Sequence, residues 1–211
     1  MATDTTATPD VKRADTHHSI DAPFRNRFSP RAFADRVVPA ETLREVLEAA
    51  RWTMSSYNEQ PWRYIIARRD GDAAHYEAVL SCLNSFNQAW AQTAPVLLLG
   101  LVRTTFAKNG RSNPHARHDL GAASAALTLQ ATMRGLYVHQ MAGIEPDVIH
   151  ETFDLPEDVE PVTGLALGYL GDPEQLPEKM QAGETAPRSR KTLADFVFGA
   201  TWGTAAPLVQ Q

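Results

Sequence analysis

The amino-acid sequence predicts an α+β fold in which a mixed β-sheet lies between layers of helices. Strand-like and helix-like segments alternate along the 211 residues, but without the strict strand–helix–strand rhythm of a parallel fold. Hydrophobic residues make up 43% of the chain and charged residues 21%, which is typical of a globular protein with a real core. There are no internal repeats, and no linker divides the chain.

We expect one domain over residues 17–211, preceded by a flexible tail over residues 1–16. The tail is rich in Thr, Asp and Ala and lacks the apolar stretch of a secretory signal. No apolar run reaches membrane-spanning length, and the net charge of -5 argues against nucleic acid as a partner. The single cysteine, Cys82, fits a reducing compartment. We therefore expect a cytoplasmic protein with no nucleic-acid or membrane partner.

Periodicity then predicts the elements in order. Pro39 suits the first turn of a helix, which runs towards residue 54 with Leu43, Val46 and Ala50 on one face. Asp72 is a plausible N-cap for the next helix. Strands are expected at residues 62–67, 96–102, 137–140 and 162–169, and further helices at 72–83, 116–134 and 146–153. Residues 104–113 resemble a mobile loop, residues 171–187 a long connection, and residues 193–211 an apolar end that packs on something, such as a partner chain.

The longest predicted helix has an unusual middle. Residues 121–126 are almost all small, which lets another helix or a flat ligand come close. This helix is therefore either the hub of the core or a subunit interface. Gly135 is expected to end it.

One stretch lies where a helical pattern stops and a strand pattern begins. Residues 54–64 combine two serines, an Asn and a Gln with large aromatic rings around Pro61. Small donors at such a corner can hydrogen-bond a polar, planar ligand without blocking its approach. The sequence therefore predicts a ligand-binding corner here.

Several common chemistries lack their motifs. The chain has no P-loop, no glycine-rich dinucleotide fingerprint and no Gly-x-Ser-x-Gly elbow. Cys82 falls on the expected core face of a helix, where an inert thiol is expected. His115 and His118 share one helical face and would suit a metal, although polar first-turn residues are the simpler interpretation.

The arginines carry a more specific signal. Arg25, Arg27 and Arg31 surround Ser29, while Arg188 and Arg190 flank Ser189 far downstream. Either set alone is typical of a solvated surface. Together they could clamp a phosphate, because guanidinium groups pair bidentately with phosphate oxygens.

Five segments resemble the FMN-dependent nitroreductase family, in the family's order. They are Arg27–Phe33, Ser55–Trp62, His118–Ala123, Gly135–Gly143 and Arg188–Arg190. The second, Ser-Ser-Tyr-Asn-Glu-Gln-Pro-Trp, is the most specific, since the family has Ser-Ser-x-Asn-x-Gln-Pro-Trp there. The resemblance covers about residues 18–208.

The resemblance implies a three-layer α/β/α sandwich with a mainly antiparallel central sheet. It also implies an obligate homodimer with FMN at the interface and NAD(P)H as co-substrate. Hydride would pass through flavin N5, in ping-pong fashion, to a small acceptor such as a nitroaromatic or a quinone. No catalytic acid or base is expected. The implied cofactor-binding residues are Arg27, Phe28, Ser29, Arg31, Met54, Ser55, Ser56, Asn58, Asn87, Gln140, Met141, Ala142, Gly143, Arg188 and Arg190.

Two departures from the family pattern leave the reaction open. Met54 stands where many members have proline, and Ala142 where some have glutamate, so only the backbone of Ala142 can serve flavin N5. The alternatives are other flavin chemistry, namely enone reduction, dehalogenation or flavin destruction, and a non-enzymatic flavin-binding module. A helical metal-binding protein built on His115 and His118 is a third alternative.

Overall fold

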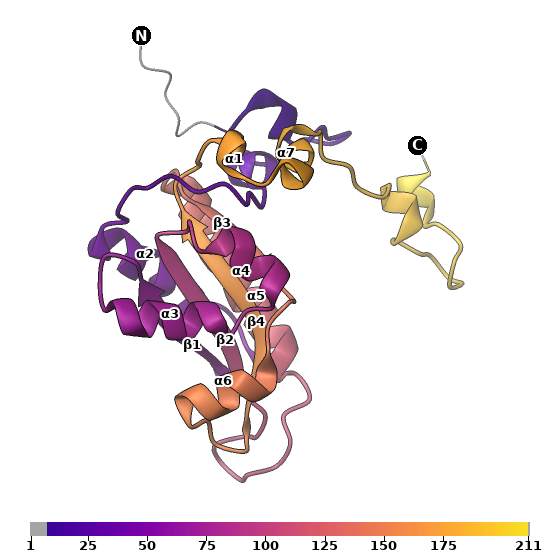
Figure 1. The fold of residues 1–211 in the computed structure, drawn as a ribbon. Helices are drawn as coiled ribbons and strands as arrows, with labels where there is room; N and C mark the ends of the chain where they lie inside the picture. The colour runs from indigo at the N-terminus through magenta and orange to yellow at the C-terminus, as the bar shows by residue number, and fades with distance from the viewer. Residues whose placement is uncertain (1–7, 211) are drawn as a thin grey trace.

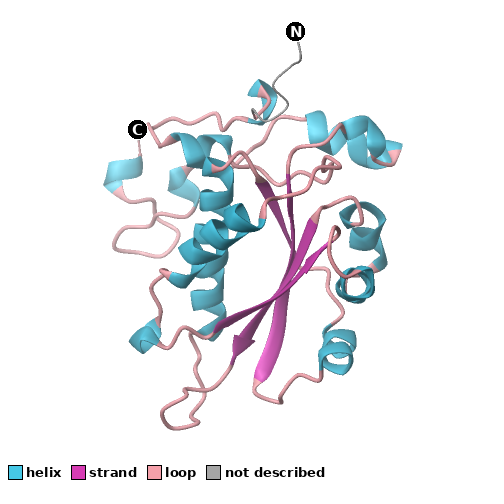
Figure 2. Ribbon diagram, turned by 90° about the vertical axis from the view of Figure 1, so that its left-hand side faces the viewer, coloured by secondary structure: helices cyan, strands magenta, loops and turns pink. Residues whose placement is uncertain are grey.

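The computed structural model describes residues 8–210 as a four-stranded sheet with helices on both faces (Figures 1 and 2). The strand order is β1–β2–β4–β3, with β1 at Trp62–Arg68, β2 at Val96–Arg103, β3 at Tyr137–Met141 and β4 at Val159–Gly168. The expected α/β/α sandwich is confirmed. All three strand pairings of the described residues are antiparallel, so the parallel pairing that a mixed sheet requires is not found among them.

Two hydrophobic cores lie on opposite faces of this sheet. One face packs against α3 (Ala73–Ser81), α4 (Ser85–Ala91) and α6 (Pro146–Phe153), and the other against α2 (Ala40–Arg51) and α5 (Ala116–Met133). Along β2, Leu97 and Leu99 enter the first core while Val96 and Leu98 enter the second. This alternation explains why the whole strand is apolar. No helix between residues 8 and 210 has both the length and the apolar composition of a membrane span.

Local signals account for several element boundaries. The Asp72 side chain caps α3 by accepting hydrogen bonds from the backbone N–H groups of Ala74 and His75. Pro39 immediately precedes α2 and supplies its N-cap. Gly135 has a φ of 71° just beyond α5, a left-handed conformation that glycine adopts easily and that ends the helix.

The structure shows two helices and a hairpin where no regular element was predicted. Helix α4 follows α3 directly, begun by the Asn84 side chain, which accepts a hydrogen bond from the backbone N–H of Asn87. Helix α7 (Glu178–Thr185) occupies part of the long connection. Residues 104–113 form a hairpin in which Thr105 pairs with Ser112, so this stretch is hydrogen-bonded rather than irregular.

Part of the expected flexible tail packs on the domain instead. Thr8 is 8% exposed and Lys12 is 5% exposed, beside a short 3-10 turn at Asp10–Lys12. Their burial rests on polar hydrogen bonds, which leave no apolar periodicity in the sequence. Residues 1–7 of the expected tail lie outside the described residues.

The C-terminal segment projects from the body of the molecule (Figure 1). It contains two 3-10 turns, Leu193–Asp195 and Pro207–Val209. Phe196, Trp202 and Leu208 are 58%, 89% and 77% exposed. Such a gathering of exposed apolar side chains is typical of a surface that another chain covers.

Candidate functional site

Four arginines gather where the loop after α1 (Ala22–Asn26) meets the segment after α7. They are Arg27, Arg31, Arg188 and Arg190, and we call them the arginine cluster. The Arg188 guanidinium joins the two segments, because it donates to the backbone carbonyl oxygens of Arg27 and, at 2.6 Å, of Arg25. Arg27 donates to Ser29 Oγ at 3.2 Å. Two sets of residues separated by more than 150 positions thus form one group.

The arginine cluster carries positive charge that its own neighbours do not neutralise. Burial lowers the pKa of Arg27 and of Arg188, and repulsion from neighbouring arginines lowers each further. Among the described residues, the buried Nε atoms of Arg31 and Arg188 have no hydrogen-bond partner. Repelling guanidinium groups with spare donors fit a phosphate group, whose oxygens accept such bonds bidentately.

A hollow of about 340 Å³ opens beside the arginine cluster. Its walls come from α1, the loop after it, α5 and β3. Its lining residues are Phe24, Arg27, Ser29, Ala125, Thr128, Leu129, Val138 and Gln140. Apolar walls with a few well-placed polar groups are typical of a small-molecule site.

The sequence alone did not predict five of these lining residues as part of a site. They are Phe24, Ala125, Thr128, Leu129 and Val138. Apolar residues on a helix or strand resemble core residues when only the sequence is known. The run of small residues over 121–126 was the available signal. Gly121 and Ala125 are exposed, and a Cβ added to Gly121 would meet no atom within 4 Å. The α5 helix is therefore both part of the core and an open surface.

Hydrogen bonds fix the side chain of Gln140 at the wall of the hollow. Its Nε2 atom donates to the backbone carbonyl oxygen of Ser124 at 3.3 Å and to Thr128 Oγ1 at 3.1 Å. Thr128 Oγ1 itself donates to the Ser124 carbonyl oxygen at 2.7 Å. With both amide protons used, Gln140 presents its side-chain oxygen as an acceptor for a ligand N–H or O–H.

Residues at the end of β3 divide into exposed and supporting groups. Ala142 is exposed, whereas Met141 is buried in the core. Gly143 is required, because a Cβ there would lie 2.3 Å from the Asn84 amide nitrogen. Its carbonyl oxygen accepts from Asn87 Nδ2 at 3.0 Å.

Asn87 and Phe28 support the site from inside the domain. The Asn87 amide oxygen accepts from Trp90 Nε1 at 3.3 Å while its nitrogen holds Gly143, so both ends of this side chain are already engaged. Phe28 is 4% exposed and packs edge-on against Tyr137, with ring centroids 5.1 Å apart. Neither side chain lines the hollow of its own chain. The resemblance, by contrast, implied that both contact the cofactor.

The predicted corner is an open turn between α2 and β1. Tyr57, Asn58 and Gln60 have φ values of 54°, 56° and 52°, a left-handed conformation that is rare outside glycine. Met54 is 79% exposed. The turn is fixed internally by the Gln60 N–H, which donates to Ser55 Oγ at 3.0 Å. Strained, exposed backbone of this kind occurs at functional sites.

The corner is tied to the start of α5, at a distance from the hollow. The backbone N–H of Ser56 donates to Asp119 Oδ2 at 3.1 Å, and Asp119 is 3% exposed in the first turn of the helix. Thr128, which lines the hollow, lies nine residues further along α5, or about 13 Å along its axis. A single chain therefore keeps Ser55, Ser56 and Asn58 apart from the arginine cluster.

Other candidate groups do not converge on a site. His115 and His118 are exposed, and residues 8–210 contain no cluster of three or more metal-ligating side chains. Cys82 is buried, and burial raises the pKa of its thiol, as expected for an inert residue.

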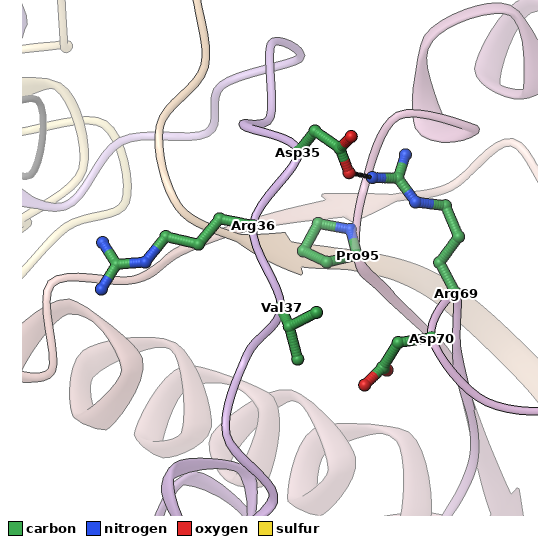
Figure 3. A pocket seen from close by; sticks show the side chains of 6 residues that line it. All are labelled: Asp35, Arg36, Val37, Arg69, Asp70 and Pro95. Carbon is green, nitrogen blue, oxygen red and sulfur yellow. Dashed lines mark hydrogen bonds and ion pairs between the residues drawn. The ribbon is translucent and has the colours of Figure 1, made fainter.

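A second hollow, of about 170 Å³, lies between the loop before α2 and the end of β1 (Figure 3). Its charged groups are matched within the chain. Arg69 pairs with Asp35, and the Arg36 guanidinium lies 3.7 Å from the centroid of the Tyr169 ring. Asp70 pairs with Arg68. Its size and its satisfied charges make it a poorer ligand site than the first hollow.

Comparison with known proteins places this arrangement in a family. The sequence profile of the nitroreductase family matches residues 24–169. An uncharacterized 15.4 kDa protein of Mycolicibacterium smegmatis is 34% identical over 146 residues, which are 67% of this chain and 97% of the relative. A Stenotrophomonas maltophilia protein provisionally named NADH dehydrogenase/NAD(P)H nitroreductase is 27% identical over 176 residues, 75% of this chain and 88% of that protein.

Solved structures give the same result. The crystal structure of an oxidoreductase containing FMN superposes with a TM-score of 0.83 at 34% identity, covering 89% of this chain and 95% of that one. A nitroreductase family protein of Clostridium difficile superposes with a TM-score of 0.63 at 27% identity, covering 83% of this chain and 94% of that one.

Proposed function

The chain belongs to the nitroreductase family, and on that premise we propose that it is an FMN-dependent oxidoreductase. In this proposal NAD(P)H is the electron donor, and a nitroaromatic, a quinone or a similar small molecule is the acceptor. The single buried cysteine, Cys82, favours a reducing compartment, so we place the reaction in the cytoplasm.

One observation carries the proposal, namely that a largely apolar hollow lies beside the arginine cluster. The phosphate of FMN would be held by Arg27, Arg31, Arg188 and Arg190, with Ser29 as a hydroxyl donor. The unpartnered Nε atoms of Arg31 and Arg188 supply spare donors for an anion. Phe24, Ala125 and Leu129 offer the apolar wall that the flavin ring of FMN requires.

When bound, FMN would supply the hydride chemistry, accepting from the nicotinamide and passing electrons to the acceptor. The protein's own residues would bind, orient and exclude water. Gln140 would accept a hydrogen bond from the ligand, and Ala142 and Gly143 would bring backbone close to it. No side chain is proposed as a catalytic acid or base, because solvent can supply the proton.

A complete site would need two copies of the chain. Met54, Ser55, Ser56 and Asn58 would reach a flavin that the partner subunit holds, since about 9 Å of α5 separates Asp119, which anchors them, from Ala125, the first residue of α5 that lines the hollow of their own chain. The exposed Gly121 and Ala125 would lie at the interface, and the C-terminal segment would cover the partner. We therefore propose a homodimer with two flavin sites.

Removing the phosphate-binding charges tests the proposal directly. We predict that the double variant R188A/R190A loses FMN affinity by about 100-fold or more, because each charge-assisted bond to phosphate is worth more than a neutral one. The measurement is FMN titration followed by flavin fluorescence. As a control, R44A/R51A removes two exposed arginines that pair with Glu41 and Glu48 on α2. It changes the net charge equally and should bind FMN as the wild type does.

Two outcomes would contradict different parts of the proposal. Full flavin content in R188A/R190A would remove the phosphate assignment. Bound FMN without any NAD(P)H oxidation, in the presence of a quinone or a nitroaromatic, would indicate a flavin-storing module instead of an enzyme.

A further inference from the structure

The N-terminal segment, residues 8–14, crosses between the two parts of the chain that supply the arginine cluster. It contacts the last residue of α1 on one side and the end of α7 on the other. Both the segment and α7 lie outside residues 24–169, which the family profile matches.

Lys12 is the centre of this contact. Its side chain is 5% exposed, and Nζ donates to the backbone carbonyl oxygens of Gly183 and Ala186, each at 2.7 Å. The ammonium also lies 5.8 Å from the centroid of the Phe28 ring. A buried ammonium requires such partners, and a cation at the C-terminal end of a helix is favourable because carbonyl oxygens point outward there.

Further hydrogen bonds attach the same segment to the end of α1, directly before the loop that holds Arg27 and Arg31. Thr8 Oγ1 donates to the carbonyl oxygen of Asn26 at 3.0 Å, one residue before Arg27. The backbone N–H of Ala14 donates to the Arg25 carbonyl oxygen at 2.8 Å, and this same oxygen accepts a bond from Arg188. The segment thus meets the Arg188 guanidinium at a shared acceptor.

Glu184 completes the connection within α7. It is 8% exposed, and its Oε2 atom accepts from the backbone N–H of Arg31 at 3.1 Å. Lys12 binds the carbonyl oxygens of Gly183, directly before Glu184, and of Ala186, two residues after it. Arg188 follows Ala186 by two residues, so the position of its guanidinium depends on where α7 ends.

We propose that Lys12 is a positioning residue for the arginine cluster, and that residues 8–14 are a structural part of the phosphate site. The inference rests on the proposed function, since it concerns how the same site is assembled. Lys12 fixes the end of α7, while Thr8 and Ala14 attach the same segment to the end of α1. Together these bonds would reduce the ordering that phosphate binding has to impose on the arginines.

The test compares two ligands that differ only in the phosphate. FMN and riboflavin share the ring and the ribityl chain, but riboflavin has no phosphate. In K12M the stem that packs near Phe28 remains while the ammonium is lost. We expect K12M to bind FMN about tenfold more weakly than the wild type and riboflavin equally well.

Three variants make the comparison specific. K12R can still donate to both carbonyl oxygens and should recover FMN affinity to within about threefold of the wild type. K179M removes an exposed lysine from the same helix α7 and should leave both affinities unchanged. T8V removes only the Thr8 hydroxyl and gives a milder test, with the same preferential loss for FMN, if K12M does not fold.

Each result decides the matter. Equal weakening of FMN and riboflavin in K12M would reduce Lys12 to a general stabilising residue and overturn the inference. Where K12M does not fold, equal weakening in T8V would overturn the assignment of residues 8–14 to the phosphate site. Unchanged FMN affinity would overturn it as well. Failure of the wild type to bind FMN at all would instead contradict the proposed function, so the two failures are distinguishable.

Discussion

His139 lies directly behind the loop that holds Arg27 and Arg31, and its imidazole is partly buried. Its Nδ1 atom is 2.9 Å from the carbonyl oxygen of Pro30, and its ring centroid is 4.6 Å from that of Trp90. Burial lowers the pKa of His139 to about 4, and the positive charges of Arg31 and Arg27 lower it as well. The ring is therefore neutral at physiological pH and holds the loop by a neutral hydrogen bond.

This histidine predicts a pH dependence of stability. In the unfolded chain the His139 pKa returns to about 6.5, so below that pH the unfolded state binds a proton that the folded state does not. The free energy of unfolding should be at its full value above about pH 6.5 and should fall by roughly 3 kcal/mol as the pH drops to about 4.

Urea unfolding across this pH range checks the expectation. The variant H139N keeps an amide donor for Pro30 but cannot titrate, so its stability should depend less on pH than that of the wild type. H118N, at an exposed histidine on α5, is the control and should retain the wild-type slope. An H139N variant with an unaltered slope would show that other groups cause the loss.

Residue types were the most predictable part of the site. The two arginine-bearing segments were expected to share a ligand, and the fold brings them together. The orientation of Asn87 was not predictable, because its inward turn depends on Gly143, which reaches it from a distant segment, as well as on Trp90, one turn further along the same helix. Sequence motifs identify which residues are available, whereas packing decides which of them face a ligand.

At the scale of elements, α5 is the scaffold of both halves of the proposed site. Its first turn holds the corner through Asp119, and its middle lines the hollow through Ala125 and Thr128. The small residues over 121–126 leave one face open while Leu120 and Leu127 fill the core on the other. One rigid helix therefore sets the spacing between the two groups of ligand donors.

Breaking the link between α5 and the corner should affect both stability and flavin binding. In D119A the backbone N–H of Ser56 loses its acceptor, and we expect a loss of about 1–3 kcal/mol in the free energy of unfolding. We also expect about tenfold weaker FMN binding, because Ser55 and Ser56 would no longer be fixed. Thermal unfolding and FMN titration measure the two effects.

The conservative variant D119N keeps a side-chain oxygen that can accept the Ser56 bond, and it should retain FMN affinity to within about threefold. A destabilised D119A that still binds FMN as tightly as the wild type would separate the corner from the flavin.

The elements with a clear apolar pattern or cap were predicted well, and helices α4 and α7 were not predicted. Helices α2, α3, α5 and α6 have clear apolar faces or caps, and the strands are rich in apolar residues. Helix α4 follows α3 so closely that the two patterns merge, and α7 is mostly polar, so neither has a distinct period. The burial of Lys12 was invisible because it depends on carbonyl oxygens about 170 residues away.

At the scale of the whole molecule, one chain exposes to solvent both groups of residues that the proposed site requires. The corner is open, with Tyr57 91% exposed, and the C-terminal segment extends from the body (Figure 1). A symmetric dimer would use the same surface twice and complete both sites at once. This explains why small residues, strained backbone and apolar side chains are all left uncovered in a single chain.

Sedimentation velocity followed at the visible absorbance of flavin tests this central claim most directly. The claim predicts that the flavin signal of the purified protein sediments with a species of twice the mass of one chain, carrying one FMN per chain. Flavin that travels with a single chain, or a dimer that binds no flavin even when FMN is added, would contradict it.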